Sequence, residues 1–322
     1  MSAKIKKPFK IWFSDMWPNF DFQNNYFTIY LSQHFDIELN PKPDFLIHSV
    51  YSKNYLKFNC YKICITGEDT RPNFSESDFH IGFDYNDSPR YLRWPLFLMN
   101  KYSPDYLIEE KDVNLIFKKK QRFCSFVVSN SYANERINFF NKLSEYKRVD
   151  SGGKCLNNIG SPVVDKFEFI SKSKFNIAFE NYSSSGYTTE KIFDAFIANC
   201  IPIYWGNPCV EADFNEKAFI NVHKYNSIDE VIAYIKYLDR NDDVYKSVLS
   251  EPAFLDNKVP EQFQLKKFVE FFAFIFEQSN QKKKVYKFAH KGIYLWYHIK
   301  AELNRYKAKL ARFKNSLLSK VS

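Results

Sequence analysis

The chain has 322 residues, of which 45% are hydrophobic and 19% aromatic, and its net charge is +9. This length suits one large domain or two medium ones with an ample core. No apolar run is long enough to cross a bilayer. The opening "MSAKIKKPFKIWF" also lacks the apolar stretch of a secretory signal, so we expect none.

Strand-like and helix-like patterns alternate along the first part of the chain. The amphipathic run at 25–35 predicts a helix. Short apolar runs predict strands at 8–14, 44–50, 61–67 and 78–84. The segment around residues 98–121 is then polar and rich in lysine, which indicates a domain junction.

A second α/β series follows this junction. We expect helices at 134–146, 190–198, 227–239 and roughly 259–279. We expect strands at 122–130, 146–150, 176–181, 201–206 and 219–223. Such alternation is typical of parallel sheets with helices on both faces. Two series joined by a linker predict two Rossmann-like domains with a cleft between them. The chain contains neither a G-x-G-x-x-G fingerprint nor a P-loop.

The six cysteines show neither paired C-x-x-C spacing nor nearby histidines. We therefore expect buried free thiols rather than a metal site, in keeping with a reducing cytosol. These cysteines are Cys60, Cys64, Cys124, Cys155, Cys200 and Cys209.

The passage "FENYSSSGYTTEKIFDA", residues 179–195, has the form of a strand, a polar loop and a helix. Thr188 or Thr189 is the natural N-cap, which places Glu190 and Lys191 in the first helical turn. A cation there opposes the helix dipole, whereas an anion bound in front of it would reverse the effect. Two interpretations of Lys191 stay open on these grounds: a solvent-facing side chain, or part of an anion site.

The same passage, continued as "FIANCIPIYWGNP", resembles the donor-binding signature of the α1,3-fucosyltransferases. "FVVSNSYANERINFFNKLSEYKRVDSGGKCLNNIG", "ITGEDTRPNF" and "IGFDYNDSPRYLRWPLF" are similar to further segments of that family, in the same order. The resemblance covers residues from about 10 to 275 and is strongest to bacterial members.

The resemblance implies a GT-B architecture, in the α/β class, with two Rossmann-like doubly wound domains. Residues 1–115 would bind the acceptor and 116–258 would bind GDP-fucose. A helix within 259–281 would return to the first domain, and 282–322 would form an amphipathic helical tail. The implied reaction is an inverting transfer of L-fucose from GDP-β-L-fucose to a sugar hydroxyl.

The resemblance also implies roles for individual residues. Glu68 matches the proposed general base. The bacterial pattern usually has Asn at the next position, whereas this chain has Asp69; two carboxylates that face each other raise one pKa, which would help a base. Arg136 and Lys191 match the cations that hold the pyrophosphate, while Glu190 matches an acid that contacts donor hydroxyls. The remaining matches are Asn181 and Tyr187 for the phosphates, Ser129 and Asn130 at a strand end, Val163 for the nucleobase and Trp17 for the acceptor.

No Asp-x-Asp motif is present, which agrees with Arg and Lys in place of a metal at the pyrophosphate. We expect no metal ligands and no tightly bound cofactor, with GDP-fucose as a substrate. Stimulation by Mn²⁺ is left open.

The end of the chain carries the positive charge. Residues 282–322 hold twelve Lys and Arg against one acid, which leaves 34 basic and 36 acidic residues before them. Apolar residues from Ile299 to Leu317 recur in steps of three and four. This pattern favours a basic helix on an anionic membrane over a homodimeric coiled coil, because like charges would flank the dimer seam.

We therefore expect a cytoplasmic bacterial α1,3-fucosyltransferase on the inner face of the cell membrane. It would act on N-acetylglucosamine in a lactosamine-type or lipid-linked glycan acceptor and make surface polysaccharide of the Lewis x type. An α1,4 linkage, another nucleotide sugar, or a non-enzymatic basic nucleotide- or nucleic-acid-binding protein are the alternatives. No nucleic-acid motif is found in the body of the chain, and homo-oligomerisation is left open.

Overall fold

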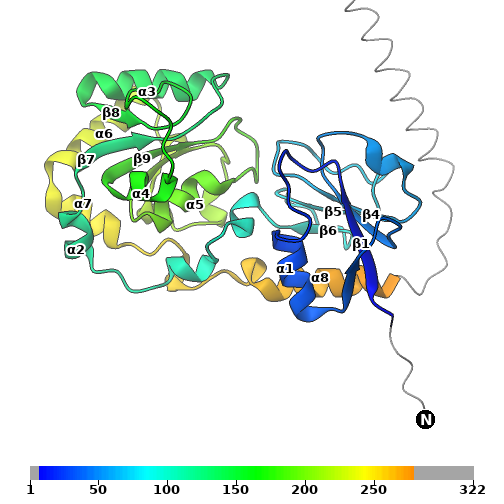
Figure 1. Cartoon of the computed structure of the whole chain (residues 1–322). Helices are drawn as coiled ribbons and strands as arrows, with labels where there is room; N and C mark the ends of the chain where they lie inside the picture. The colour runs from blue at the N-terminus through cyan, green and yellow to red at the C-terminus, as the bar shows by residue number, and fades with distance from the viewer. Residues whose placement is uncertain (1–6, 279–322) are drawn as a thin grey trace, which may run out of the picture.

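The computed structural model describes residues 7–278. Two α/β units lie side by side, each built around one parallel sheet, as Figure 1 shows. This arrangement confirms the expectation of two Rossmann-like domains. The predicted amphipathic tail, 282–322, lies outside the described residues.

The sheet of the first unit has six strands in the order β2-β1-β3-β4-β5-β6, and every neighbouring pair is parallel. Its strands are β1 (Phe9–Ser14), β2 (Ile37–Leu39), β3 (Phe45–His48), β4 (Tyr61–Ile65), β5 (Phe79–Gly82) and β6 (Tyr91–Arg93). All residues of β3 (FLIH) and β5 (FHIG) are buried, in keeping with their mostly apolar sequence, and each strand also buries one histidine. The short strands β2 and β6 were not predicted, because three residues of mixed polarity give no periodic signal.

Helix α1 (Tyr26–His34) begins at Asn25, whose side-chain oxygen accepts a hydrogen bond from the Thr28 amide at 3.0 Å. The last described helix, α8 (Leu265–Glu277), runs beside α1 against the same sheet (Figure 1). Its Phe276 ring stacks on Phe9 with centroids 4.3 Å apart. The helix expected over 259–279 starts only at Leu265, because Pro260 is extended and residues 261–263 form one 3₁₀ turn.

The sheet of the second unit has five strands in the order β11-β10-β9-β7-β8, also all parallel. The strands are β7 (Arg122–Phe126), β8 (Val149–Ser151), β9 (Ser173–Phe179), β10 (Ile201–Trp205) and β11 (Ile220–Asn221). The helices are α3 (Asn134–Tyr146), α4 (Lys166–Ser171), α5 (Glu190–Ile197), α6 (Ile228–Arg240) and α7 (Asp242–Ser250). The strand expected over 122–130 ends at Phe126, and α4 and α7 were not predicted.

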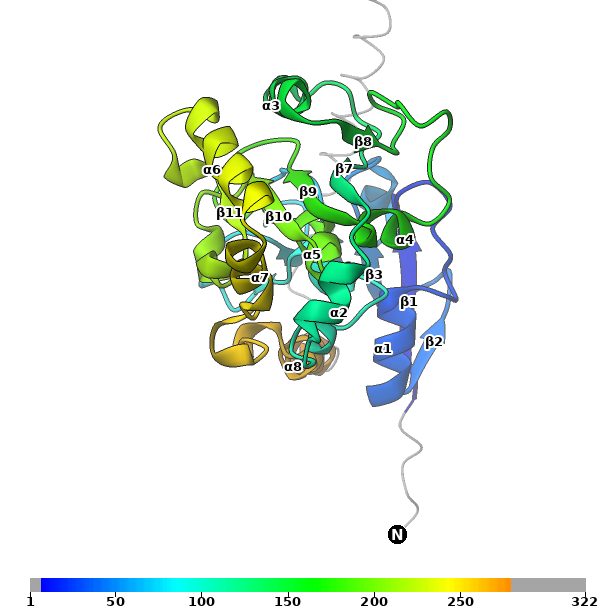
Figure 2. The ribbon, with the colours of Figure 1, turned by 90° about the vertical axis from the view of Figure 1, so that its left-hand side faces the viewer.

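Helices cover both faces of this second sheet, as Figure 2 shows from the side. Buried residues of α3, α6 and α7 pack together with Phe175 and Ile203 of the sheet in one cluster. Residues of α4 and α5, among them Ile170 and Ala195, form another cluster that lies apart from the first. The second unit is therefore doubly wound.

The segment between the sheets is more than a polar linker. It contains α2 (Val113–Lys118) and two 3₁₀ turns, Leu96–Met99 and Pro104–Leu107. Phe97 of the first turn is fully buried and packs against Phe193 of α5 and Phe214. One apolar core therefore includes side chains from both units. The other 3₁₀ turns are Asn54–Lys57, Val210–Ala212, Glu216–Ala218, Val222–Lys224, Leu255–Asn257 and Glu261–Phe263.

All six cysteines lie within the described residues and none is paired. Five are buried, as expected, but Cys209 is exposed. Within residues 7–278, no helix has the length and apolar character needed to cross a bilayer.

Candidate active site

The strand order of the second sheet reverses between β7 and β9, because β8 lies beyond β7 and β10 beyond β9. Ligands of doubly wound sheets bind outside the carboxyl ends of the strands at such a point. The segment after β7 carries Ser129 and Asn130, and the segment after β9 carries Asn181. The topology therefore brings these predicted donor residues to the same edge.

Arg136 of α3 links the two segments. Its guanidinium donates to the backbone oxygen of Asn130 at 2.7 Å and to Oδ1 of Asn181 at 3.1 Å. A third hydrogen bond reaches the Phe179 oxygen at 3.3 Å. The side chain is 0% exposed, and burial lowers its pKa. No carboxylate within residues 7–278 lies within 4.0 Å of this cation, and its buried Nε has no hydrogen-bond partner there. This buried positive charge is suited to an incoming anion.

Lys191 lies in the first turn of α5, whose N-cap is Thr189. Its ammonium is 2.9 Å from Glu180 Oε2 and 2.8 Å from Thr189 Oγ1, and Glu190 Oε1 lies at 3.6 Å. Burial works against the charged form, but Glu180 and Glu190 outweigh it and raise the pKa of Lys191. The lysine therefore does not point into solvent. A carboxylate of the chain itself already lies beside it.

Glu190, the first residue of α5, is only partly buried. Burial alone would raise its pKa, but the ammonium groups of Lys191 and Lys166 lower it to about 2. The carboxylate is consequently ionised at neutral pH and can accept hydrogen bonds from hydroxyl groups.

Tyr187 and Gly186 bring the loop after β9 against the first unit. The Tyr187 ring is buried and meets Phe83 edge to face, with centroids 5.1 Å apart, and this burial raises its pKa. Gly186 has a φ of +81°, and a Cβ there would lie 2.4 Å from the Phe83 oxygen. Only glycine permits this approach without strain.

The candidate base, Glu68, is exposed in the segment after β4. Tyr51 donates a 3.3 Å hydrogen bond to its Oε1, and the Glu68 amide donates to Thr66 Oγ1 at 3.0 Å. The neighbouring Asp69 accepts a hydrogen bond from Ser184 at 2.6 Å and lies 3.8 Å from Arg71. The segment that carries Glu68 thus touches the loop that carries Asn181 and Tyr187.

The structure places Trp17 in the loop after β1, at the edge of the first sheet that also bears Glu68. Its ring is 38% exposed and packs edge to face on Phe20. Val163 is half-buried, and its amide donates to the Gly152 oxygen at 2.9 Å. Ser129 is exposed, and the backbone of its neighbour Val128 lies directly against Gly153.

Several residues of this region were given no role from the sequence alone. Glu180 belongs to the quoted motif, yet no role was assigned to it, although a buried acid at a strand end is a usable signal. Arg93 and Asp213 form a two-pronged ion pair, with bonds of 2.9 and 2.8 Å, and Thr188 donates to the same aspartate at 3.3 Å. No local pattern connects residues so far apart in the chain.

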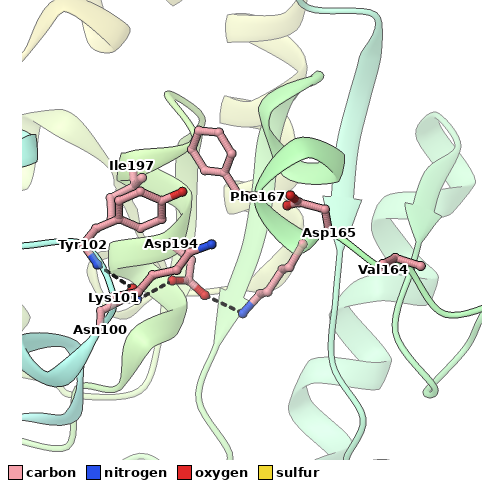
Figure 3. A pocket seen from close by; sticks show the side chains of 9 residues that line it. Asn100, Lys101, Tyr102, Val164, Asp165, Phe167, Asp194 and Ile197 are labelled. Carbon is pink, nitrogen blue, oxygen red and sulfur yellow. Dashed lines mark hydrogen bonds and ion pairs between the residues drawn. The ribbon is translucent and has the colours of Figure 1, made fainter. Parts of the chain in front are cut away.

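A cavity of about 380 Å³ adjoins the other end of α5 (Figure 3). Within it, Asp194 accepts hydrogen bonds from Asn100 at 2.8 Å and from Lys166 at 2.6 Å. The cavity holds none of the predicted site residues. It shows instead how the segment between the sheets anchors the helix that carries Glu190 and Lys191.

No group of three or more His, Cys, Asp or Glu side chains within residues 7–278 is arranged to hold a metal ion. Arg136 and Lys191 both lie near the carboxyl end of β9, where Arg136 bonds to Asn181 and Lys191 to Glu180.

Two Rossmann-like units, the second with Arg136 and Lys191 near its switch point, make up the GT-B fold found in glycosyltransferases. Residues 11–100 match the family model of the α-(1,3)-fucosyltransferase FucT N-terminal domain. Residues 117–289 match that of the glycosyltransferase family 10 (fucosyltransferase) C-terminal region. The chain belongs to glycosyltransferase family 10, the fucosyltransferases, which confirms the expectation from its motifs.

Individual relatives agree with this membership. The chain is 35% identical over 325 residues to the α-(1,3)-fucosyltransferase FucT of Helicobacter pylori. The aligned region covers 87% of this chain and 68% of the relative. A crystal structure of an α1,3-fucosyltransferase with GDP-fucose is 33% identical, with a TM-score of 0.72 over 89% of this chain and 94% of that one. The same comparison with an α1,3-fucosyltransferase bound to GDP gives 34% identity and a TM-score of 0.74, over 88% and 93%.

Proposed function

We propose that the chain transfers L-fucose from GDP-β-L-fucose to the 3-hydroxyl of N-acetylglucosamine in a lactosamine-type acceptor, with inversion. The observation that carries this proposal is the pair of cations, Arg136 and Lys191, beside the carboxyl end of β9. A nucleoside diphosphate is the anion that a GT-B donor domain takes at this edge. Family membership and the relatives solved with GDP-fucose and GDP support the identity of the donor.

The reaction requires one bond to form as another breaks. The acceptor oxygen attacks C1 of fucose, and the bond from C1 to the phosphate oxygen breaks with its electron pair leaving on GDP. Negative charge therefore grows on the diphosphate in the transition state, where Arg136 and Lys191 stabilise it. Asn181 and Tyr187 contact the phosphates, and Glu190 accepts a hydrogen bond from a donor hydroxyl. Ser129, Asn130 and Val163 line the nucleoside side of the site.

Glu68 takes the proton that the acceptor hydroxyl loses. Its exposure suits this role, because an incoming sugar can reach the carboxylate. The hydrogen bond from Tyr51 holds one carboxylate oxygen and leaves the other for the substrate. Trp17, exposed on the same sheet edge, offers a ring face for the acceptor sugar to stack on.

The acceptor, membrane contact and location belong to the same proposal. The product would be a Lewis x-type antigen in the lipopolysaccharide of a bacterium. The enzyme would work in the cytoplasm, at the inner face of the membrane, through the basic residues of 282–322. A homo-oligomer and stimulation by Mn²⁺ remain predictions. Rates measured with EDTA and with MnCl₂ test the second.

The deciding experiment is a transfer assay with GDP-fucose against paired lactosamine isomers, followed by linkage analysis of the products. We expect α1,3-linked fucose on the isomer with a free 3-hydroxyl. An α1,4 product on the other isomer, or turnover only with a different nucleotide sugar, would replace this proposal with one of its alternatives.

A further inference from the structure

Glu180 is a fully buried acid at the point where β9 gives way to the donor loop. It is 0% exposed, and its amide still pairs with the Trp205 oxygen of the neighbouring strand at 2.8 Å. Its side chain packs directly over Gly206, where an added Cβ would lie 2.4 Å from Glu180 Cγ. Both the backbone and the side chain of this residue are therefore fixed by the sheet.

Within residues 7–278, the three hydrogen bonds to the Glu180 carboxylate all come from the start of α5. Oε1 accepts from the Thr189 amide at 2.7 Å, and Oε2 accepts from the Thr189 hydroxyl at 2.6 Å and from Lys191 at 2.9 Å. A capping box would satisfy the N-cap amide with a Glu or Gln side chain three residues on. That position is Ile192, which is apolar, and Thr189 makes no side-chain cap of its own. Glu180 supplies the missing acceptor from another element.

The same contacts determine how many N–H groups of the Lys191 ammonium are available to a ligand. An ammonium group has three N–H donors. One donates to Glu180 Oε2 and a second to Thr189 Oγ1, whose own proton goes to Glu180. Glu190 Oε1, at 3.6 Å, lies beyond hydrogen-bond distance. Among residues 7–278, one N–H of Lys191 therefore has no acceptor, and the other two set its direction. A lysine on its flexible stem has no such direction by itself.

We propose that Glu180 is a positioning residue of the transfer reaction, which acts through Lys191 on the diphosphate of the donor. It does not touch the substrate. It holds the ammonium so that its remaining N–H meets a phosphate oxygen both in the bound donor and as charge develops on the leaving group. This inference rests on the proposed function, since it takes a nucleoside diphosphate as the ligand.

A double-mutant cycle tests the proposal, with the dissociation constant of GDP measured by calorimetry in the full chain. Glu180→Gln removes the negative charge that orients Lys191. It also replaces one carboxylate oxygen by an amide N–H₂, which faces groups that themselves donate hydrogen bonds. We expect about tenfold weaker GDP binding and a lower kcat for Glu180→Gln. In the Lys191→Met background, the same substitution should change GDP affinity by less than about twofold, because the group through which Glu180 acts is gone.

A structural role gives a different result. If Glu180→Gln weakened GDP binding equally with and without Lys191, Glu180 would act on the fold, and the inference would be wrong. Unchanged or tighter GDP binding by the single variant would overturn it as well. If Glu180→Gln folds poorly, Thr189→Val removes only the bridging hydroxyl and should show the same dependence on Lys191.

The other end of the same strand provides a matched control. Asp239 is a nearly buried carboxylate that accepts from Lys147 at 3.0 Å and lies 3.2 Å from Lys174, the second residue of β9. Asp239→Asn should lower the melting temperature yet leave GDP affinity unchanged. Failure of the wild-type chain to bind GDP would instead count against the proposed function itself, a result distinct from all of these.

Discussion

The Ser184 hydroxyl donates a 2.6 Å hydrogen bond to the Asp69 carboxylate, and this bond joins the donor loop to the segment that carries the candidate base. The two residues come from different sheets, 115 positions apart. Their contact links the loop after β9 to the segment after β4. It also gives Asp69 a contact with the second unit that its place in the sequence did not predict.

Ser184→Ala should slow transfer by about threefold to tenfold, the net contribution of one typical hydrogen bond. GDP affinity should stay the same, because the substitution loosens the bridge and not the anion seat. Steady-state rates with both substrates varied check this, with the exposed neighbour Ser183→Ala as the control. Equal rates for the two variants would show that the bridge does not matter for turnover.

Glu68→Ala should abolish transfer, with a loss of at least about 100-fold, while GDP still binds within about twofold of wild type. The reason is that the acceptor proton then has no base. Rates and calorimetry together check this, with Glu109→Ala as a variant of another exposed acid. Normal turnover by Glu68→Ala would remove this residue from the mechanism.

Arg136→Lys should weaken GDP binding by roughly tenfold although the charge is kept. Lysine cannot reach Asn130, Asn181 and the diphosphate at once, because it lacks the planar fork of arginine. The control for the same chemical change is Arg148→Lys, because Arg148 is an exposed arginine that forms an ion pair with Asp150. Retained GDP affinity in Arg136→Lys would mean that only the charge matters.

Acid should destabilise the chain partly through Glu190. Its pKa is about 2 in the folded protein against 4.5 for the free group, so the stabilisation is present above pH 4.5 and is lost as the pH falls toward 2. Glu190→Gln should therefore show a smaller drop in unfolding free energy over that window. Urea denaturation at several pH values measures it. Parallel pH curves for the two proteins would contradict the shift.

Deletion of residues 282–322 should release the chain from vesicles that contain anionic lipid, while transfer to soluble acceptors continues. Twelve basic residues lie in that segment, and each contributes about 1 kcal/mol near an anionic surface. Co-sedimentation with anionic and neutral vesicles checks this at low and high salt. Undiminished sedimentation of the shortened chain would assign membrane binding to the body.

Much of the fold could be predicted because the spacing of apolar residues along the sequence indicates which residues are buried. Strands such as β3 and β5, buried on both faces, were predicted where they occur. The short edge strand β2 and helices α4 and α7 are held by tertiary contacts that no local pattern shows. Among the site residues, Arg136 bonds to both Asn130 and Asn181, although the three come from separate motifs. The contacts of Glu180 were not foreseen, since they depend on how the end of β9 faces the start of α5.

The aromatic core around Phe97, Phe193 and Phe214 crosses from one sheet to the other. A hinge at this point would have to open packed rings to water, at a cost that a single substrate molecule does not easily offset. The position of one unit relative to the other is thus fixed when the chain folds. A fragment that holds either sheet alone would expose half of this core, so we expect the two halves to melt in one transition and to aggregate when made apart.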